Sequence, residues 1–134
     1  MTDTIAGSHG QWLDAYRRAW IEKNAAAARE LFTPDAVYRE QPFDPPFVGS
    51  AAIADYWSRV TRAQRDIRLR YGRPVVAGNR LAVEWWATLV NEDAPYTLAG
   101  EFLLRFAEDG RCRELREYWI LREGTHEPPA GWGT

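Results

Sequence analysis

Four strand-like segments in the second half of the chain constrain its fold most. Apolar and polar residues alternate over 66–76, 80–90, 96–107 and 111–121, which is the period of a half-buried β-strand. The connections between these segments are short turns, so the four strands are predicted to pair as antiparallel neighbours. Pro74 cannot donate to a strand ladder and is therefore predicted at a sheet edge or a bulge.

Two helices are predicted at the start of the chain. A capping-box pattern begins at Ser8, and apolar residues then recur at helical spacing to about Lys23. Asn24 is predicted to cap a second, short helix over 25–32, which Thr33-Pro34 ends. The short connection between the two segments predicts a helical hairpin.

A strand and a third helix follow the hairpin. The alternation over 35–40 predicts a strand that stops at the proline-rich segment QPFDPPF, because proline lacks the backbone donor of a strand ladder. Ser50 is predicted to cap a helix that reaches about Thr61. The element order is thus ααβαββββ, which defines an α+β fold with the helices on one face of a curved, mainly antiparallel sheet.

Length and composition narrow the class of protein. A chain of 134 residues predicts one domain, with its core at about 8–122 and an irregular tail over 123–134 that lies on a neighbouring surface through Trp132. The net charge of -2 leaves no basic stripe for nucleic acid or acidic membranes. Cys112 is the one cysteine, which fits a reducing cytoplasm. With one cysteine and two distant histidines no cluster has metal-ligand spacing, and an all-carboxylate site is the alternative that stays open. We expect a soluble, cytoplasmic protein without a leader, a metal or an organic cofactor.

The strand alternation separates two faces of the sheet. The face toward the helices is predicted to carry Leu81, Val83, Trp85, Ala87 and Leu89, then Leu98, Gly100, Phe102, Leu104 and Phe106, then Leu115, Glu117, Trp119 and Leu121. The outer face is predicted to carry Glu84, Trp86, Thr88, Glu101, Leu103, Arg105, Arg116, Tyr118 and Ile120. The outer set is rich in apolar residues for a face left in water, which predicts a homodimer through the outer sheet face; the alternative is a monomer with ordinary exposed apolar atoms.

Three polar side chains occupy positions where the pattern calls for apolar ones. They are Tyr16 in the first helix, Glu40 at the end of the first strand and Glu117 on the core face of the last strand. Burial raises the pKa of a carboxyl group, which suits it to acid–base chemistry near neutral pH. Structural alternatives stay open: Tyr16 as a core tyrosine, Glu40 as a solvated residue, and Glu117 as the ion-pair partner of Arg39 or Arg113.

The segments LFTPDAVYREQPFDPPFVGSAAIADYW and DGRCRELREYW resemble the SnoaL-like, nuclear transport factor 2-like superfamily. The resemblance extends over roughly Gln11 to Arg122 and implies a cone-shaped α+β domain. Members of this superfamily include isomerases, cyclases, hydrolases, dehydratases and non-catalytic binders, so the resemblance alone implies no single activity.

Two groups within the superfamily imply different roles for the same residues. Against ketosteroid isomerases, Tyr16 matches the oxyanion-donating tyrosine and Glu40 the general base, while Phe102 replaces the protonated aspartate. That replacement removes half of the oxyanion hole and argues against steroid isomerisation. Against limonene-epoxide-hydrolase-like enzymes, Tyr38 matches a water-positioning tyrosine and Glu117 a catalytic aspartate.

In the second comparison Glu40 matches an asparagine, while Trp85 and Ala87 replace the essential arginine and second aspartate, so epoxide hydrolysis by that triad is not expected.

The sequence and the resemblance together predict an isomerase- or cyclase-type enzyme that acts on a small apolar carbonyl compound. Glu40 is the expected base, Tyr16 the donor to the developing oxyanion, and Glu117 a second acid or a water-positioning group. The expected pocket walls are Phe32, Tyr38, Trp57, Trp85, Phe102 and Trp119, with the proline-rich segment as a wall or lid. The alternative is a non-catalytic pocket for an apolar ligand, or a dimerisation module with a filled core.

Overall fold

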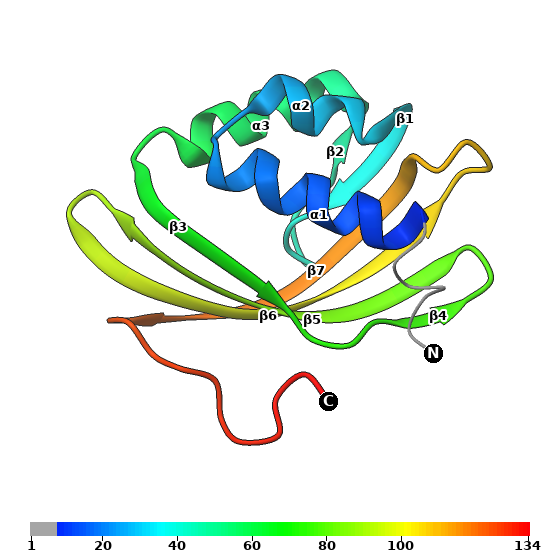
Figure 1. The fold of residues 1–134 in the computed structure, drawn as a ribbon. Helices are drawn as coiled ribbons and strands as arrows, with labels where there is room; N and C mark the ends of the chain where they lie inside the picture. The colour runs from blue at the N-terminus through cyan, green and yellow to red at the C-terminus, as the bar shows by residue number, and fades with distance from the viewer. Residues whose placement is uncertain (1–7) are drawn as a thin grey trace.

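The computed structural model describes residues 8–134, and the predicted role of the Ser8 side chain and the expected absence of a leader in 1–7 fall outside what it describes. Figure 1 shows the helices together on one side of a curved sheet and the C-terminal tail on the other side. Over residues 8–134 the elements are α1 (Ser8–Ile21), α2 (Ala25–Glu30), β1 (Phe32–Arg39), β2 (Phe47–Val48), α3 (Ser50–Thr61), β3 (Gln64–Tyr71), β4 (Val75–Ala77), β5 (Arg80–Asn91), β6 (Ala94–Phe106) and β7 (Cys112–Glu123). This arrangement confirms the predicted α+β fold.

The strands of the described chain form one sheet in the order β2-β1-β7-β6-β5-β3, and β4 also pairs with β5. The predicted antiparallel pairing of β5, β6 and β7 is confirmed. Glu92 and Asp93 close the β5–β6 hairpin with φ angles of 50° and 70°, as a two-residue turn of this hand requires. The strand β1 pairs in parallel with β7, so two segments far apart in the sequence lie side by side in the sheet.

Several predicted boundaries differ from the structure, and two of the differences have a clear cause. The second helix ends at Glu30 rather than 32, because Phe32 already pairs with Cys112 in β7, and the Cys112 amide donates to the Leu31 carbonyl at 2.8 Å. The strand predicted over 66–76 is two strands, β3 and β4, since Pro74 interrupts the ladder between them.

The proline-rich segment contains a strand that the sequence pattern did not predict. Phe47 and Val48 form β2, which returns antiparallel to Tyr38 and Val37. The prediction that Ser50 caps α3 is also wrong. Ser50 is the first helical residue, and the cap is Gly49, whose φ of 97° is a left-handed conformation that favours glycine. By contrast, the predicted cap at Asn24 is confirmed, because its side chain accepts from the Ala27 amide at 3.0 Å.

The face of the sheet toward the helices carries the predicted apolar residues. The residues of this set that are buried are Leu81, Val83, Trp85, Ala87, Leu89, Phe102, Leu104, Phe106 and Leu115. Leu98 and Trp119 are only partly buried, and Leu121 is 49% exposed. Incomplete burial of these three residues marks the part of this face where a cavity lies instead of packed core.

The tail after β7 is irregular, as predicted, and it folds back on the outer face of its own sheet. The Trp132 ring packs edge-on against Trp86 at 5.9 Å, and the Trp86 indole donates to the His126 carbonyl at 2.8 Å. The Gly133 amide donates to Glu84 at 3.2 Å. The tail therefore occupies part of the face through which a homodimer is predicted.

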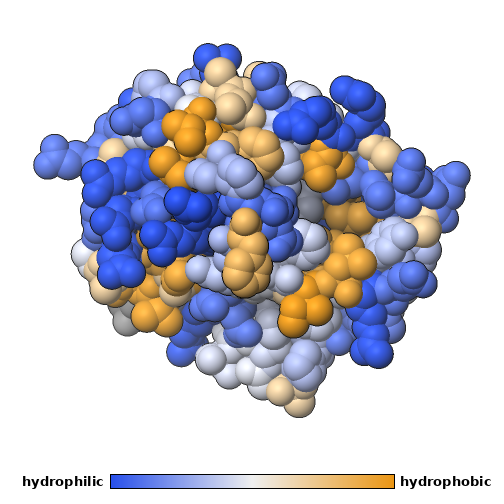
Figure 2. Space-filling view, turned by 180° about the vertical axis from the view of Figure 1, so that it is seen from behind, coloured by the Kyte–Doolittle hydropathy of each residue, from blue (hydrophilic) through white to orange (hydrophobic). Residues whose placement is uncertain are grey.

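Other outer-face residues remain uncovered, including Tyr118 at 45% and Ile120 at 76% exposure. Figure 2 views the molecule from behind the view of Figure 1, not directly onto the outer sheet face, and on that side apolar side chains form separate clusters among polar ones. The homodimer stays a prediction. No helix within residues 8–134 combines the length and apolar character needed to cross a bilayer.

Candidate functional site

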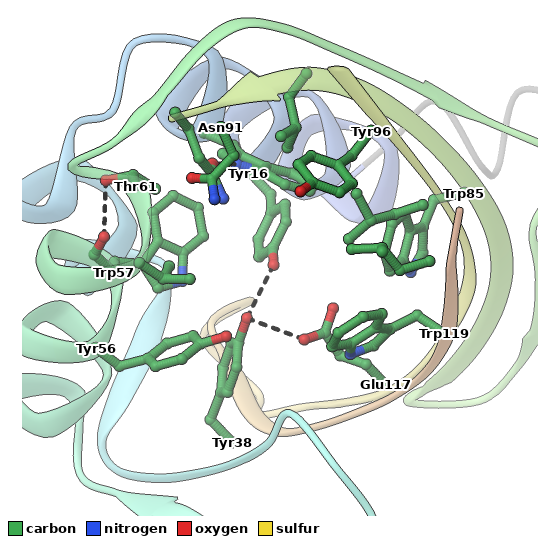
Figure 3. Close-up of a pocket in the computed structure, with 16 residues that line it drawn as sticks. Tyr16, Tyr38, Tyr56, Trp57, Thr61, Trp85, Asn91, Tyr96, Glu117 and Trp119 are labelled. Carbon is green, nitrogen blue, oxygen red and sulfur yellow. Dashed lines mark hydrogen bonds between the residues drawn. The ribbon is translucent and has the colours of Figure 1, made fainter. Parts of the chain in front are cut away.

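A cavity of about 430 Å³ lies between the helices and the inner face of the sheet (Figure 3). Its lining is mainly aromatic, which is typical of a site for a small apolar molecule. The lining residues are Tyr16, Trp20, Tyr38, Tyr56, Trp57, Val60, Thr61, Gln64, Trp85, Leu89, Asn91, Tyr96, Leu98, Glu117, Trp119 and Leu121. The prediction of a pocket agrees with this cavity, and the filled-core alternative does not.

Three polar side chains meet at one side of the cavity (Figure 3). The Tyr38 hydroxyl donates to Oε2 of Glu117 at 3.4 Å, and the Tyr16 hydroxyl lies 3.2 Å from that of Tyr38. Because Tyr38 has one hydroxyl proton and gives it to Glu117, Tyr16 is the donor in the second contact. Both contacts exceed the roughly 2.7 Å usual for two oxygens.

Local structure explains why these side chains meet. Glu117 lies on β7 between Leu115 and Trp119, on the face that the strand alternation turns toward the helices. The parallel pairing of β1 with β7 sets Tyr38 beside Leu115 on that same face. Tyr16 comes from α1 and packs edge-on against Trp57 at 5.1 Å, which holds its hydroxyl over the sheet.

Burial dominates the electrostatics of this group. Burial and, to a lesser extent, the nearby charge of Glu40 raise the pKa of Glu117, and the hydrogen bond from Tyr38 lowers it; together they bring this pKa to about 8. No ion pair found among residues 8–134 includes Glu117, so the structural alternative of an ion pair with Arg39 or Arg113 is not what the structure shows. Burial, followed by the charge of Glu117, also raises the pKa of both Tyr16 and Tyr38, so both phenols stay protonated near neutral pH.

Glu40 is placed differently from the expectation. It follows Arg39, the last residue of β1, whose partner in β7 is Arg116, so Glu40 comes level with Glu117. Its side chain is half-buried but does not line the cavity. Burial raises the pKa of Glu40, a hydrogen bond with Gln41 opposes this, and the charge of Asp44 adds to the rise. The structure thus brings Glu40 beside the site without making it part of the cavity wall.

Four of the six predicted wall residues line the cavity, namely Tyr38, Trp57, Trp85 and Trp119. Phe32 and Phe102 do not, because they are 1% and 0% exposed and lie beneath the wall, where Phe102 packs against Tyr16 at 5.1 Å.

Several lining residues were not predicted. The main ones are Trp20, Tyr56, Gln64, Asn91 and Tyr96. Extending the alternation of β5 by one residue and reading the start of β6 in the same way would have assigned Asn91 and Tyr96 to the inner face. Tyr56 gave a weaker signal, as the residue beside Trp57 on α3. Among residues 8–134, no three His, Cys, Asp or Glu side chains gather closely enough to share a metal ion.

The SnoaL-like domain family matches residues 13–115, which is most of the chain. The chain therefore belongs to the SnoaL-like domain family, and its fold is that of the nuclear transport factor 2-like superfamily. No curated protein is a significant match to the sequence.

Solved structures share the fold at low sequence identity. The epoxide hydrolase/cyclase-like enzyme SalBIII, of pyran ring formation in the polyether salinomycin, is similar with a TM-score of 0.78 and 18% identity, over 92% of this chain and 100% of that one. A protein of ketosteroid isomerase-like fold from Catenulispora acidiphila DSM 44928, in complex with trimethylamine, has a TM-score of 0.72 and 19% identity, over 80% of this chain and 83% of that one. An LEH-like epoxide hydrolase of M. tuberculosis has a TM-score of 0.70 and 16% identity, over 82% of this chain and 80% of that one.

Proposed function

We propose that this SnoaL-like domain is a cyclase- or isomerase-type enzyme that transfers a proton within a small, largely apolar carbonyl compound. The observation that carries the proposal is the buried Glu117 carboxyl, which faces an aromatic cavity and accepts a hydrogen bond from Tyr38. Its pKa of about 8 is close to the pH at which a proton can be both taken and returned. Membership of the SnoaL-like family and a fold shared with a cyclase-like enzyme support a cyclase- or isomerase-type role.

Glu117 is the acid–base group of the proposed reaction. Its carboxylate removes a proton from the carbon beside the carbonyl group, and the electron pair moves to the carbonyl oxygen to give an enolate. Glu117 is then neutral and no longer needs the Tyr38 proton, so the Tyr38 hydroxyl can turn to the enolate oxygen. Glu117 returns its proton to another carbon of the enolate, and the carbonyl group re-forms. No other co-reactant is needed.

Tyr16 and Glu40 have supporting roles in this proposal. Tyr16 donates a hydrogen bond to the Tyr38 hydroxyl, which makes Tyr38 a stronger donor to the enolate oxygen. Tyr16 thus stabilises the negative charge of the enolate through Tyr38. Glu40 acts through its charge, which raises the pKa of Glu117 and makes its carboxylate a stronger base. This assignment differs from the expectation from sequence, in which Glu40 was the base, because Glu117 lines the cavity and Glu40 does not.

The test uses 5-nitrobenzisoxazole, an apolar compound that needs only a base. Removal of its C3 proton breaks the N–O bond and releases a coloured cyanonitrophenolate. The wild-type protein should accelerate this reaction, with a rate that rises with pH through a midpoint near 8 to a plateau, since the carboxylate form of Glu117 is the active one. Glu117→Gln should lower the rate by about 10² to 10⁴.

Glu101→Gln is the matched control, because it makes the same chemical change on the exposed outer face of β6 and should leave the rate unchanged. Glu117→Gln with the wild-type rate would contradict the role of Glu117. A wild-type protein that binds the compound but does not accelerate its reaction would favour the alternative, a non-catalytic apolar-ligand-binding domain.

A further inference from the structure

A second polar group lies across the cavity from Glu117. Figure 3 shows Asn91 and Tyr96 reaching into the cavity from the side opposite to Tyr38 and Glu117. The strand register brings Gln64 to the same place, because Gln64 of β3 is the direct partner of Asn91 in β5. We call Gln64, Asn91 and Tyr96 the distal group. All three line the cavity.

The orientation of the Gln64 amide follows from its partner. The Trp20 indole donates to Oε1 of Gln64 at 2.9 Å, and an indole N–H can only donate, so the atom it meets is the carbonyl oxygen. The NH₂ of Gln64 is the end left to meet a ligand, and it needs an acceptor. Asn91 and Tyr96 each add a donor and an acceptor of their own.

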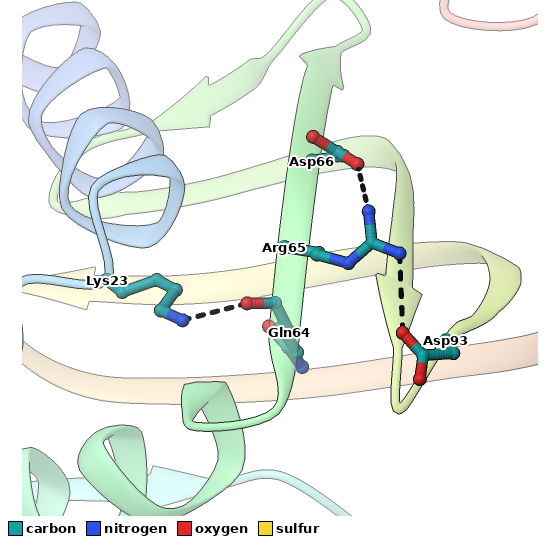
Figure 4. A network of polar contacts seen from close by, with 5 residues as sticks. All are labelled: Lys23, Gln64, Arg65, Asp66 and Asp93. Carbon is teal, nitrogen blue, oxygen red and sulfur yellow. Dashed lines mark hydrogen bonds and ion pairs between the residues drawn. The ribbon is translucent and has the colours of Figure 1, made fainter.

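Contacts behind the distal group hold it in place (Figure 4). Lys23 donates to the backbone carbonyl of Gln64 at 2.9 Å, which ties the start of β3 to the end of α1. Arg65 contacts Asp66 at 2.8 Å and Asp93, in the β5–β6 turn, at 3.5 Å. These exposed contacts contribute little stability, but they link the strands from which the distal group projects.

The chemistry of the cavity defines the kind of molecule that can bridge its two sides. Between them lie apolar walls formed by Trp57, Trp85, Leu89, Leu98 and Trp119. The lining contains no Arg, Lys or His to compensate an anionic ligand group, and its one acidic residue, Glu117, is mostly uncharged at neutral pH and so does not favour a cation. Phe102 pairs with Glu117 in the neighbouring strand, and about 20 Å of strand separates Phe102 from Tyr96 along β6. Because the Glu117 and Tyr96 side chains both point into the cavity, their polar atoms are closer together than this backbone distance.

We propose that the ligand of this cavity is a neutral, elongated molecule with two polar ends, one oxygen at Tyr38 and Glu117 and a hydroxyl or carbonyl group at the distal group. The inference rests on the proposed function for the choice of the reacting end. The distal group determines specificity and takes no part in proton transfer. Compounds that lack the second polar group leave the Gln64 amide without an acceptor and bind less tightly.

The test compares 4-phenylphenol with 4,4′-dihydroxybiphenyl, which differ by one hydroxyl at the far end, by isothermal titration calorimetry. Wild-type protein should bind the dihydroxy compound about three- to tenfold more tightly, as expected for one added hydrogen bond. Asn91→Leu should reduce this preference, mainly through loss of affinity for the dihydroxy compound, while Gln64 and Tyr96 retain part of it. Tyr96→Phe should reduce the preference in the same direction.

Thr88→Val is the control, because Thr88 lies on β5 but does not line this cavity, and it should keep the wild-type preference. Equal affinities in the wild-type protein, an unchanged preference in both distal variants, or no binding of either compound would overturn the proposal. The two proposals fail differently. A retained hydroxyl preference without any acceleration of 5-nitrobenzisoxazole would contradict the enzyme and leave the distal group standing.

Discussion

Two glutamates three residues apart on β7 show how the two faces of one sheet differ. Glu114 lies on the outer face, where its carboxylate contacts Arg116 at 3.1 Å and Arg105 at 3.9 Å. Glu117 lies on the inner face, is 8% exposed, and has a tyrosine hydroxyl as its hydrogen-bond partner. The same residue type is thus an ordinary surface ion-pair partner on one face and a group with a pKa of about 8 on the other. The environment, rather than the residue type, makes Glu117 the candidate for chemistry.

The largest expected effect is on the pH dependence of stability. The pKa of Glu117 is raised from its ordinary value of 4.5 to about 8, so the folded chain keeps a proton that the unfolded chain loses between these pH values. Stability should therefore fall as pH rises through this window. Glu117→Gln removes this titration. As pH rises through the window, the free energy of unfolding of Glu117→Gln should therefore increase relative to that of wild type. The increase should be roughly 1.4 kcal/mol for each unit by which the folded and unfolded pKa values of Glu117 differ, a few kcal/mol in all.

Urea unfolding at a series of pH values measures this effect. Glu114→Gln is the outer-face counterpart and should change the free energy of unfolding by less than about 1 kcal/mol. A constant difference between Glu117→Gln and wild type from pH 4 to 9 would contradict the contrast between the two faces.

A steric prediction tests how tightly the inner face is packed. A Cβ atom on Gly100 would lie 2.4 Å from Cζ2 of the buried Trp85 ring. Gly100→Ala should therefore lower the free energy of unfolding by about 1–3 kcal/mol, because the ring must move. Ala99→Ser, one residue earlier and on the outer face, should change it by less than about 0.5 kcal/mol, and similar losses in both variants would argue against a tighter inner face.

Removal of one hydroxyl group should also act differently on the two faces. Tyr38→Phe takes away the donor to Glu117 and the acceptor of Tyr16, which should cost about 1–2 kcal/mol of unfolding free energy. The same change should move the midpoint of the pH–rate profile upward, since the Tyr38 hydrogen bond lowers the pKa of Glu117. Tyr118→Phe on the outer face should change neither quantity measurably. A downward shift of the pH–rate midpoint in Tyr38→Phe would contradict the role of Tyr38 as hydrogen-bond donor to Glu117.

The smallest expected effect comes from Glu40. Glu40→Gln removes the charge that raises the pKa of Glu117, so the midpoint of the pH–rate profile should move down. The maximal rate should change little, because Glu40 does not line the cavity. A rate loss as large as that of Glu117→Gln would restore Glu40 as the base expected from the sequence.

Much of the fold could be predicted from the sequence, because the signals that define it are local. The period-two alternation of β5, β6 and β7 assigned their residues to the correct faces, and the same alternation singled out Glu117 as polar on an apolar face. The pairing of β1 with β7 is parallel and joins segments far apart in the chain, so no local pattern contains it. The resemblance to known families was needed to expect a cavity.

The site was less predictable, because it depends on where individual strands end. Glu40 continues the alternation of Tyr38, but β1 ends one residue earlier, at Arg39, and the Glu40 side chain leaves the cavity wall. Asn91 lies one residue beyond the predicted end of its strand, and its partner Gln64 lies before the predicted start of another. In the ketosteroid isomerase comparison Phe102 replaces an aspartate, and the structure pairs Phe102 with Glu117, so a carboxyl group is present one strand away.

The most direct test of the account is the pKa of Glu117 itself. A carboxyl-carbon NMR titration of protein labelled at glutamate side chains, with Glu117→Gln to assign the resonance, measures it without a substrate. We predict one glutamate that titrates with a pKa of about 8 and is absent from the variant. A value for Glu117 near 4.5 would contradict its assignment as a buried acid–base group.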